Sequence, residues 1–409
     1  MLDTDILITG AGSAGLTLAL LLAKSCPNLQ ITVLDQGPAP VAGPVSLARV
    51  SALNLASQRV LTELGVWQQL TANPAYQQMH VWEADSFARI EFSPTDLGVF
   101  ANSSALGWIV DNEELRSCLY QRALQFPNIQ WRFDITIQQI SASERQNLLT
   151  LSDGSAYISQ LLVGADGANS LVREQLKMPL VFWDYDHHGL VALVRTEQAH
   201  QATARQVFLP TGPLALLPLA DPHVVSIVWS VAPERAAELI ALPAAEFNQA
   251  LTAASQAVLG VLTVQSARRS YPLKMRYASQ WVKHNVVLVA DAAHTIHPLA
   301  GQGMNLGLMD VCALAELIVQ NINSGQTCNE QRMLRQYERW RKAEAQQMIA
   351  LMEAFKRGFM LHNPLAKLVR AVGMLATNQL SPVKRQLLAA ALGNSGDLPA
   401  VARPDVIKL

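Results

Sequence analysis

Glycine and aspartate residues near the start of the chain have the types and spacing of a phosphate-binding turn. Gly10, Gly12 and Gly15 follow the apolar stretch Ile6–Thr9 and precede a longer apolar one. Glycines at this spacing allow a tight turn, close approach of a pyrophosphate and close helix–strand packing. Asp35 follows after about twenty residues, where an acceptor for a ribose hydroxyl belongs. The stretch predicts strand, turn, helix and strand around a dinucleotide, with the phosphates at the helix N-terminus. A glycine-softened strand and helix without a ligand is the alternative.

A second acid-and-glycine turn lies far along the chain. Asp291 ends the apolar stretch 285–290, and Gly301 and Gly303 precede a helix expected from about Leu306. A helix start of this kind can hold a polar or partly anionic group. Two such turns in one chain are expected to enclose the two ends of one elongated ligand.

Three further charged residues are candidates for the same site. Asp166 and Gly167 end the buried strand expected at 161–164, and a carboxylate at a strand tip is typical of a ligand position, with a turn-forming role as the alternative. Arg49 lies where a cofactor would lie, outside the carboxyl ends of the first strands. Arg116, in a helix that begins near residue 111, can reach back to the same place. A solvated surface charge is the alternative for each arginine.

The pattern changes between residues 179 and 271, where short alternating stretches are separated by proline and glycine. This predicts a mostly antiparallel sheet inserted into the first domain. Trp183, Tyr185 and His187 lie at its entry and could line a pocket for an aromatic substrate, with core packing as the alternative. His187 and His188 point in opposite directions along an extended strand, so a shared metal ion is not expected.

Composition restricts the class of protein. Half of the 409 residues are hydrophobic and the net charge is −1, so no bulk attraction to nucleic acid is expected. The four cysteines form no CxxC pair, and the N-terminus lacks the basic start of a secretory signal, which together predict a cytoplasmic protein. Near the C-terminus, residues 363–375 predict a helix with an apolar stripe beside Lys367 and Arg370. That stripe either packs on the body or on another subunit, or rests on a membrane surface.

Taken together, these motifs resemble those of the FAD-dependent aromatic hydroxylases of the para-hydroxybenzoate hydroxylase type. They occur in the family's order and cover nearly the whole chain: Gly10-x-Gly12-x-x-Gly15 with Asp35, residues 49–54, residues 164–170, and residues 291–305. Within the family, the chain is most similar to the hydroxylases of ubiquinone biosynthesis, above all those that act on 2-octaprenylphenol at ring carbon C5. This closer similarity lies in residues 49–67, 182–188, 204–208, 221–229 and 294–301.

The patterns and the resemblance imply an α/β fold. It has a Rossmann-like FAD-binding domain, an inserted mostly antiparallel β-sheet substrate domain and a helical C-terminal region. The expected limits are 1–75, 101–178 and 274–330 for the FAD-binding domain, 76–100 and 179–273 for the substrate domain, and 331–409 for the C-terminal region.

The resemblance also implies roles for individual residues. The FAD pyrophosphate would be bound by Gly10, Gly12, Ser13, Ala14 and Gly15, and the adenosine ribose by Asp35. Arg49 and Arg116 would lie near the middle of the cofactor, and Asp166 and Gly167 would support FAD and could also support NAD(P)H. Asp291 would bind near the ribityl chain, and Gly301, Gly303, Met304 and Asn305 would meet the isoalloxazine. The substrate pocket would include Trp183, Tyr185, His187 and Pro298. Pro298 and Gly301 would leave room for O₂. His297 is a candidate base, as is His294, with a turn-shaping role as the alternative for both.

The implied reaction is hydroxylation of a polyprenylphenol by O₂ and NAD(P)H through a flavin C4a-hydroperoxide. A prenyl tail is too long to enclose, so the pocket would open towards lipid or a lipid-carrying partner. The protein is accordingly expected to make peripheral contact with the inner membrane or to take part in a ubiquinone-biosynthesis complex. It could also form a homo-oligomer. The alternatives are hydroxylation of another ring position or another phenol, flavin chemistry of another kind such as halogenation or reduction of isoprenoid double bonds, and a non-catalytic FAD-binding scaffold.

Two residues depart from the family pattern. Ala290 stands where glycine usually precedes the aspartate of the second turn, and its methyl is expected to be tolerated if φ is negative. Asp35 replaces the more usual glutamate, and its shorter carboxylate can still accept a hydrogen bond from a ribose hydroxyl. FAD binding is therefore expected to survive both changes.

Overall fold

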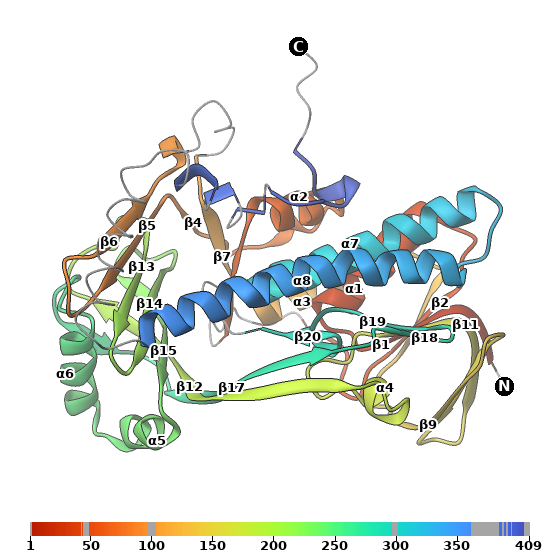
Figure 1. Cartoon of the computed structure of the whole chain (residues 1–409), viewed down its shortest axis with the longest axis horizontal. Coiled ribbons are helices and arrows are strands. Elements are labelled where there is room, and N and C mark those ends of the chain that lie inside the picture. The colour runs from red at the N-terminus through yellow and green to blue at the C-terminus, as the bar shows by residue number, and fades with distance from the viewer. Residues whose placement is uncertain are drawn as a thin grey trace, which may run out of the picture.

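The computed structural model describes residues 2–41, 43, 49–96, 104–296, 302–360, 384–386, 388–389, 392–393 and 395–404. Two large sheets lie at opposite ends of an elongated body, and the long strands β12 and β17 run between them (Figure 1). Helix α8 (Gln331–Met360) crosses the molecule above these two strands. The expected site residues His297, Pro298 and Gly301, and the helix expected at 363–375, lie outside the described residues.

The first sheet contains the predicted strand–turn–helix–strand unit. Its strands, in order across the sheet, are β18 (Val282–Lys283), β19 (Val286–Leu288), β11 (Ala156–Gly164), β1 (Leu2–Thr9), β2 (Ile31–Leu34) and β8 (Ile129–Arg132). Strands β9 (Ile137–Ala142) and β10 (Asn147–Leu151) extend it through β11. Because β19, β11, β1, β2 and β8 are all parallel, the loops that follow them leave from one edge of the sheet.

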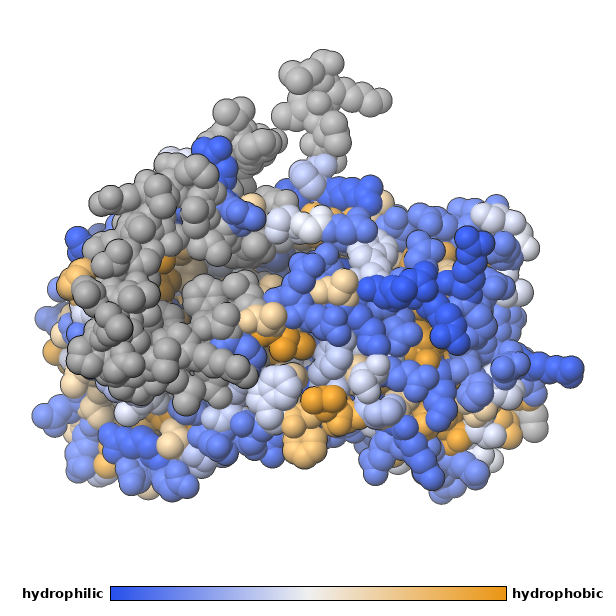
Figure 2. Space-filling view, in the orientation of Figure 1, coloured by the Kyte–Doolittle hydropathy of each residue, from blue (hydrophilic) through white to orange (hydrophobic). Residues whose placement is uncertain are grey.

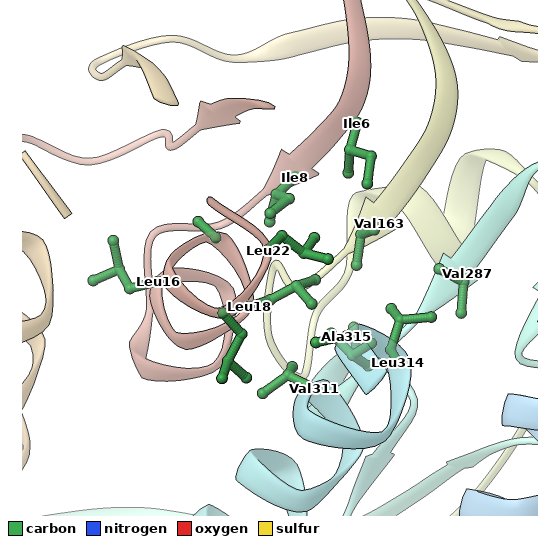
Figure 3. Packing of buried hydrophobic residues seen from close by; sticks show 14 of the residues in the cluster. Ile6, Ile8, Leu16, Leu18, Leu22, Val163, Val287, Val311, Leu314 and Ala315 are labelled. Carbon is green, nitrogen blue, oxygen red and sulfur yellow. The ribbon is translucent and has the colours of Figure 1, made fainter. Parts of the chain in front are cut away.

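Apolar side chains from the sheet and two helices form the main core. Helix α1 (Ser13–Ser25) and helix α7 (Gln302–Asn323) pack against each other, and Figure 3 shows their apolar residues meeting those of β1, β11 and β19. Ile6, Leu7 and Ile8 are all fully buried, which is why β1 is continuously apolar rather than alternating. The core fixes the strand ends, and with them the loops at the carboxyl edge.

The second sheet is mostly antiparallel, as predicted. Its strands, in order, are β20 (His294–Thr295), β17 (Arg269–Ala278), β12 (Leu180–Thr196), β15 (Val224–Val231), β14 (Gly212–Pro218), β13 (Thr203–Leu209), β5 (Gln78–Glu83) and β6 (Arg89–Phe92), with β16 (Leu262–Val264) beside β12. Only the pair β13 and β5 is parallel among the described strands of this sheet. Strand β17 continues to Ala278, and β20, which follows the Asp291 turn, pairs with it. The second acid turn therefore connects the two sheets.

The remaining elements join these layers. A small sheet contains β3 (Val50–Leu53), β7 (Gly107–Asp111) and β4 (Ala75–Tyr76). The other helices are α2 (Leu55–Glu63), α3 (Asn112–Ala123), α4 (Leu171–Gln175), α5 (Pro233–Ala241) and α6 (Ala244–Ala254), with 3-10 turns η1 (Trp67–Gln69), η3 (Ala290–Ala292) and η5 (Ala400–Ala402).

Among the described residues, one helix is long and apolar enough to cross a membrane. It is α7, and 72% of its apolar window is buried inside the fold, as expected of a core helix. Figure 2 shows that the visible described surface on the right of the view, where α7 ends and α8 begins, is mainly hydrophilic.

Candidate functional site

The predicted ligand-binding turns meet at the carboxyl edge of the first sheet. The Gly10 turn follows β1, Asp35 follows β2, Asp166 follows β11, and Asp291 follows β19. In the sheet, β2, β1, β11 and β19 are consecutive neighbours. Neighbouring strands are about 4.8 Å apart, so the four turns form a row roughly 14 Å long. An elongated ligand could contact all of them at once.

The three glycines of the first turn have different reasons to be glycine. Gly10 has a φ of +101°, and a Cβ there would collide with the carbonyl oxygen of Ala165 in the neighbouring turn. A Cβ on Gly15 would collide with the carbonyl oxygen of Gly10. At Gly12, in contrast, a Cβ would meet nothing within 4 Å. Gly10 and Gly15 are therefore needed for the fold, whereas Gly12 leaves free space in front of the turn.

Two charged side chains hold the outer side of this turn. The Asp35 carboxylate accepts hydrogen bonds from the backbone N–H groups of Ala11 (2.6 Å) and Gly37 (2.7 Å). Arg116 donates from Nε to the Ala11 carbonyl (2.8 Å), and its Nη2 lies 3.9 Å from Asp35. Arg116 is thus not a freely solvated charge. Each carboxylate oxygen of Asp35 keeps a lone pair that a ligand hydroxyl could use.

The turn after β11 packs against the Gly10 turn and is connected to the Asp291 turn. Asp166 accepts hydrogen bonds from the backbone N–H groups of Leu171 (2.8 Å) and Val172 (3.2 Å) at the start of α4. Its other oxygen is buried and has no hydrogen-bond partner among the described residues. Burial raises the pKa of the Asp166 carboxyl, against the lowering effect of these bonds. Asp166 therefore shapes the turn and also retains one oxygen for a further contact.

Buried Arg173 joins two turns that sequence reasoning treated separately. Its guanidinium donates to the carbonyls of Ala168 and Ala292, both at 2.8 Å. The first carbonyl belongs to the turn after β11 and the second to the 3-10 turn after β19. Arg173 was not identified from the sequence, because nothing there distinguishes it from an ordinary charged residue of a helix.

Ala290 requires a correction. The methyl was expected to be tolerated at negative φ, but Ala290 has a φ of +51°. A non-glycine residue in this left-handed region is strained by about 1–2 kcal/mol. Space for the methyl comes from Gly307 in α7, where a Cβ would lie 2.8 Å from the Cβ of Ala290. Glycine would adopt this left-handed conformation without strain, whereas this chain adopts it with an alanine.

A buried ionic network supports the Ala290 turn. Asp310 of α7 accepts hydrogen bonds from the Ala290 N–H (3.1 Å), from His294 Nε2 (2.5 Å) and from Arg341 Nε (2.9 Å). The three side chains are almost completely inaccessible, with exposed fractions of 1%, 0% and 2% for His294, Asp310 and Arg341. Burial alone would raise the pKa of Asp310, but His294 and Arg341 outweigh it and hold that pKa below its ordinary value.

This network was missed from the sequence, although a signal was present. Asp310 is a single acid in the apolar run from Leu306 to Ala315, where a charge must have a partner. Its partner Arg341 was noted only as one of several basic residues in a helix. Nothing in the sequence paired the two, because they lie on different helices.

Asp291 is solvent-accessible but closely surrounded by protein. The surrounding protein atoms partly desolvate its carboxyl and raise the pKa, as does the charge of Asp310, whereas the charges of His294, Arg49 and Arg276 act in the opposite direction. Arg49 also lies over the ring of Tyr271 in β17, with its Cζ 5.9 Å from the ring centroid. Arg49 therefore lies between the acid turn of the first sheet and a strand of the second, and it is exposed to solvent.

The residues at the start of α7 fall into two groups. Asn305 donates from Nδ2 to the Ala52 carbonyl (2.8 Å) and accepts from the Asn54 N–H (3.0 Å) and Ser57 Oγ (2.7 Å). Its side chain thus fastens the β3–α2 connection to α7. Gly303 and Met304 are only half-buried beside it.

The aromatic residues of β12 contact helix α8. Trp183 Nε1 donates to Glu353 Oε1 at 3.2 Å, and burial followed by the charge of Glu353 raises the pKa of the Tyr185 phenol. His187 instead lies at a bulge in β12, with its ring nitrogens 2.8 Å and 3.3 Å from the carbonyls of Tyr185 and Thr211. Trp183 and Tyr185 are therefore together, and His187 faces another part of the sheet.

Comparison with known proteins identifies the class to which this site belongs. Residues 3–352 match the model of the FAD binding domain family. Among solved structures, p-nitrophenol 4-monooxygenase PnpA from Pseudomonas putida aligns over 97% of this chain and all of its own, with a TM-score of 0.79 at 16% identity. PqsL from P. aeruginosa aligns over 92% and 100% of the two chains, with a TM-score of 0.76 at 22% identity. These two show the same fold.

Sequence relatives are closer. The chain is 34% identical to 3-demethoxyubiquinol 3-hydroxylase of Escherichia coli, over 95% of this chain and 98% of that protein. It is 32% identical to the ubiquinone biosynthesis monooxygenase COQ6 of Xenopus tropicalis, over 95% and 93% of the two chains. The chain belongs to the FAD-dependent monooxygenase family that contains these ubiquinone-biosynthesis hydroxylases, which confirms the resemblance found in the sequence.

Proposed function

We propose that the protein hydroxylates the aromatic ring of a polyprenylphenol in ubiquinone biosynthesis, at ring carbon C5. The reaction would consume NAD(P)H, a proton and O₂, and would release NAD(P)⁺ and water as one oxygen atom enters the ring. The observation that carries the proposal is the row of four turns at one edge of the first sheet, next to the strands of the second sheet. The named relatives support the substrate class.

The residues present fit FAD. The free space in front of Gly12 suits a pyrophosphate, and so do the N–H groups at the start of α1, which no side chain of the described residues caps. When bound, FAD supplies the electron transfer from NAD(P)H and the activation of O₂. Asp35 would accept from the adenosine ribose, Arg116 and Arg49 would lie near the phosphates and the middle of the cofactor, and Asp291 would accept from the ribityl chain.

The protein itself would then position the cofactor and the substrate and shield them from water. The turns at 166 and 291 are fastened to each other by Arg173, so a ligand lying across them meets a fixed surface. Gly303 and Met304, half-buried at the start of α7, would lie at the flavin ring, where the helix N-terminus favours negative charge. Arg49, between this edge and Tyr271, would lie on the side of the substrate sheet. Trp183 and Tyr185 would form a more distant wall beside α8.

The first experiment tests the chemistry. Purified protein should be yellow with bound FAD, and NAD(P)H oxidation should increase when a polyprenylphenol is added. With isotope-labelled O₂, one labelled oxygen should appear in the phenolic product. Incorporation of halide, or saturation of prenyl double bonds, would replace this proposal by another flavin chemistry. A yellow protein that consumes no O₂ with any phenol would favour a non-catalytic scaffold.

A second experiment tests the ring position. Deleting the gene in its host should cause accumulation of the precursor that lacks the C5 hydroxyl, and the wild-type gene should restore the quinone. Accumulation of a precursor blocked at another carbon would move the proposed reaction to that position, as in the E. coli relative named for 3-hydroxylation.

We also propose that the protein is cytoplasmic and meets its substrate at the inner membrane or within a biosynthetic complex. The reason is the prenyl tail, which is too apolar to leave lipid readily. The fraction of protein that sediments with vesicles containing a polyprenylphenol, compared with vesicles lacking it, measures this contact. Gel filtration of the same preparation reports whether the protein is a homo-oligomer.

A further inference from the structure

The buried carboxylate of Asp310 makes three hydrogen bonds whose donors come from three different places. One donor is the backbone of the strained residue Ala290, one is His294 at the end of the same turn, and one is Arg341 of α8. Asp310 itself is in α7, outside the four turns at the carboxyl edge of the first sheet. The carboxylate therefore holds both ends of the segment that contains Asp291.

We propose that Asp310 is a positioning residue for the cofactor: it holds Ala290 in the left-handed conformation that places Asp291 at the flavin ribityl chain. The proposal rests on the proposed function, because it assumes that Asp291 meets FAD. It assigns to Asp310 and Arg341 a role in cofactor affinity although neither contacts the expected cofactor position.

The geometry supports a specific role rather than general stabilisation. Strained backbone persists only where the surroundings over-determine it, and it gathers at functional sites. At Ala290 the surroundings are the Asp310 bond to its N–H and the space left by Gly307, both supplied by α7. His294 Nε2 must carry the proton that it donates, because a carboxylate only accepts. The ring also stacks on buried Trp281, with the ring centroids 5.1 Å apart, so the far end of the turn is fixed as well.

Arg341 makes the arrangement tolerable in a dry interior. A buried carboxylate without a positive partner would be neutralised or would draw in water, and either change would weaken its bond to Ala290. Because Arg341 comes from α8, which also reaches the second sheet through Glu353, the turn is set by contacts from outside its own domain.

The test compares wild-type holoenzyme with the variants Asp310→Asn, Ala290→Gly/Asp310→Asn and Glu338→Gln. Glu338 is a matched control, since this carboxylate of α8 also accepts a backbone N–H, from Trp281 at 2.7 Å, and pairs with Lys342 at 3.2 Å. FAD is removed and titrated back at a temperature at which circular dichroism shows each variant folded. The Kd for FAD, the visible spectrum and the midpoint potential of the bound flavin are measured.

We expect Asp310→Asn to raise the Kd for FAD by about tenfold or more and to shift the midpoint potential. Adding Ala290→Gly should recover at least about a third of the lost affinity for FAD, because glycine adopts the left-handed conformation without a bond from Asp310. Glu338→Gln should leave the Kd within about twofold of wild type.

Three results would overturn the proposal. They are a folded Asp310→Asn protein with the wild-type Kd and potential, no recovery from Ala290→Gly, and an equal loss in Glu338→Gln. If Asp310→Asn does not fold, Arg341→Lys provides the measurement, because it keeps the charge but moves the donor; a wild-type Kd and potential there would also overturn the proposal. A wild-type protein that binds no FAD would instead refute the proposed function and remove the basis of this inference with it.

Discussion

The turn after β1 and the turn after β19 present backbone to the same edge of the sheet in different ways. In the first turn, the unusual conformation belongs to glycine, with Gly10 at a φ of +101°. In the second, it belongs to Ala290 at +51°, whose N–H donates to the buried Asp310 of α7. The first turn therefore reaches its unusual conformation through its own glycine, although Asp35 and Arg116 bond to its outer side, whereas the second turn depends on α7 and α8.

The two turns therefore differ in what maintains the backbone conformation of the binding site. A glycine turn needs no partner to reach its conformation, so it fails when a side chain collides with the turn itself or with the turn beside it. A strained alanine turn is only as reliable as the contacts that hold it. The following changes should affect the two turns differently, and they are ordered from the largest expected effect.

The largest effect is expected within the glycine turn. Gly15→Val should lower the free energy of unfolding by about 4 kcal/mol or more, because its side chain would collide with the Gly10 backbone. Gly12→Val should cost only about 1 kcal/mol, as expected for a helix N-cap, but should abolish the yellow colour of bound FAD. Urea denaturation and the ratio of flavin to protein absorbance measure the two effects. Full retention of FAD by Gly12→Val would refute its assignment to the pyrophosphate.

The second turn should be most sensitive at Asp310. Asp310→Asn should lower the free energy of unfolding by about 3 kcal/mol, because it leaves Arg341 buried without its counter-charge. The control Glu338→Gln, which is partly exposed, should cost about 1 kcal/mol. Chemical denaturation of the two proteins side by side gives the comparison. Equal losses would indicate that the buried network adds nothing beyond an ordinary helix contact.

Acid should weaken the second turn specifically. The pKa of Asp310 is lower in the folded protein than in the unfolded chain, so its stabilising contribution is present above the unfolded value of about 3.9 and is lost as pH falls through the folded value. The free energy of unfolding should therefore fall more steeply below about pH 4 in wild type than in Asp310→Asn. Asp166, whose pKa is raised by burial, acts oppositely in both proteins and cancels in the difference. Asp291 does not cancel, because the charge of Asp310 is one cause of its raised pKa, and its contribution reduces the predicted difference. Parallel pH curves for the two proteins would contradict the prediction.

The smallest effect is expected from relieving strain. Ala290→Gly should raise the free energy of unfolding by about 1 kcal/mol, since glycine has no penalty at positive φ. Ala293→Gly, three residues along at a φ of −89°, should instead lower it by about 1 kcal/mol. Thermal and urea unfolding of the pair test the sign, and a loss of stability in both would show that the Ala290 conformation is not strained.

The sequence alone determined the parts that depend on neighbouring residues. The unit β1–α1–β2, the acid after β2 and the apolar strands before Asp166 and Asp291 were all predicted, because glycine spacing and continuous apolar runs are local signals. The mostly antiparallel second sheet was predicted from another local signal, short alternating stretches separated by proline and glycine. The family resemblance added the flavin cofactor and the reaction.

Only the tertiary structure decided how these parts support one another. It placed Arg116 on the Ala11 carbonyl, joined two turns through Arg173, and gave Ala290 a positive φ that the sequence had not indicated. It also brought Asp310 and Arg341 together from different helices. Such contacts are set by how strands and helices pack in three dimensions, and a charge at one position carries no local sign of which distant backbone group it will meet.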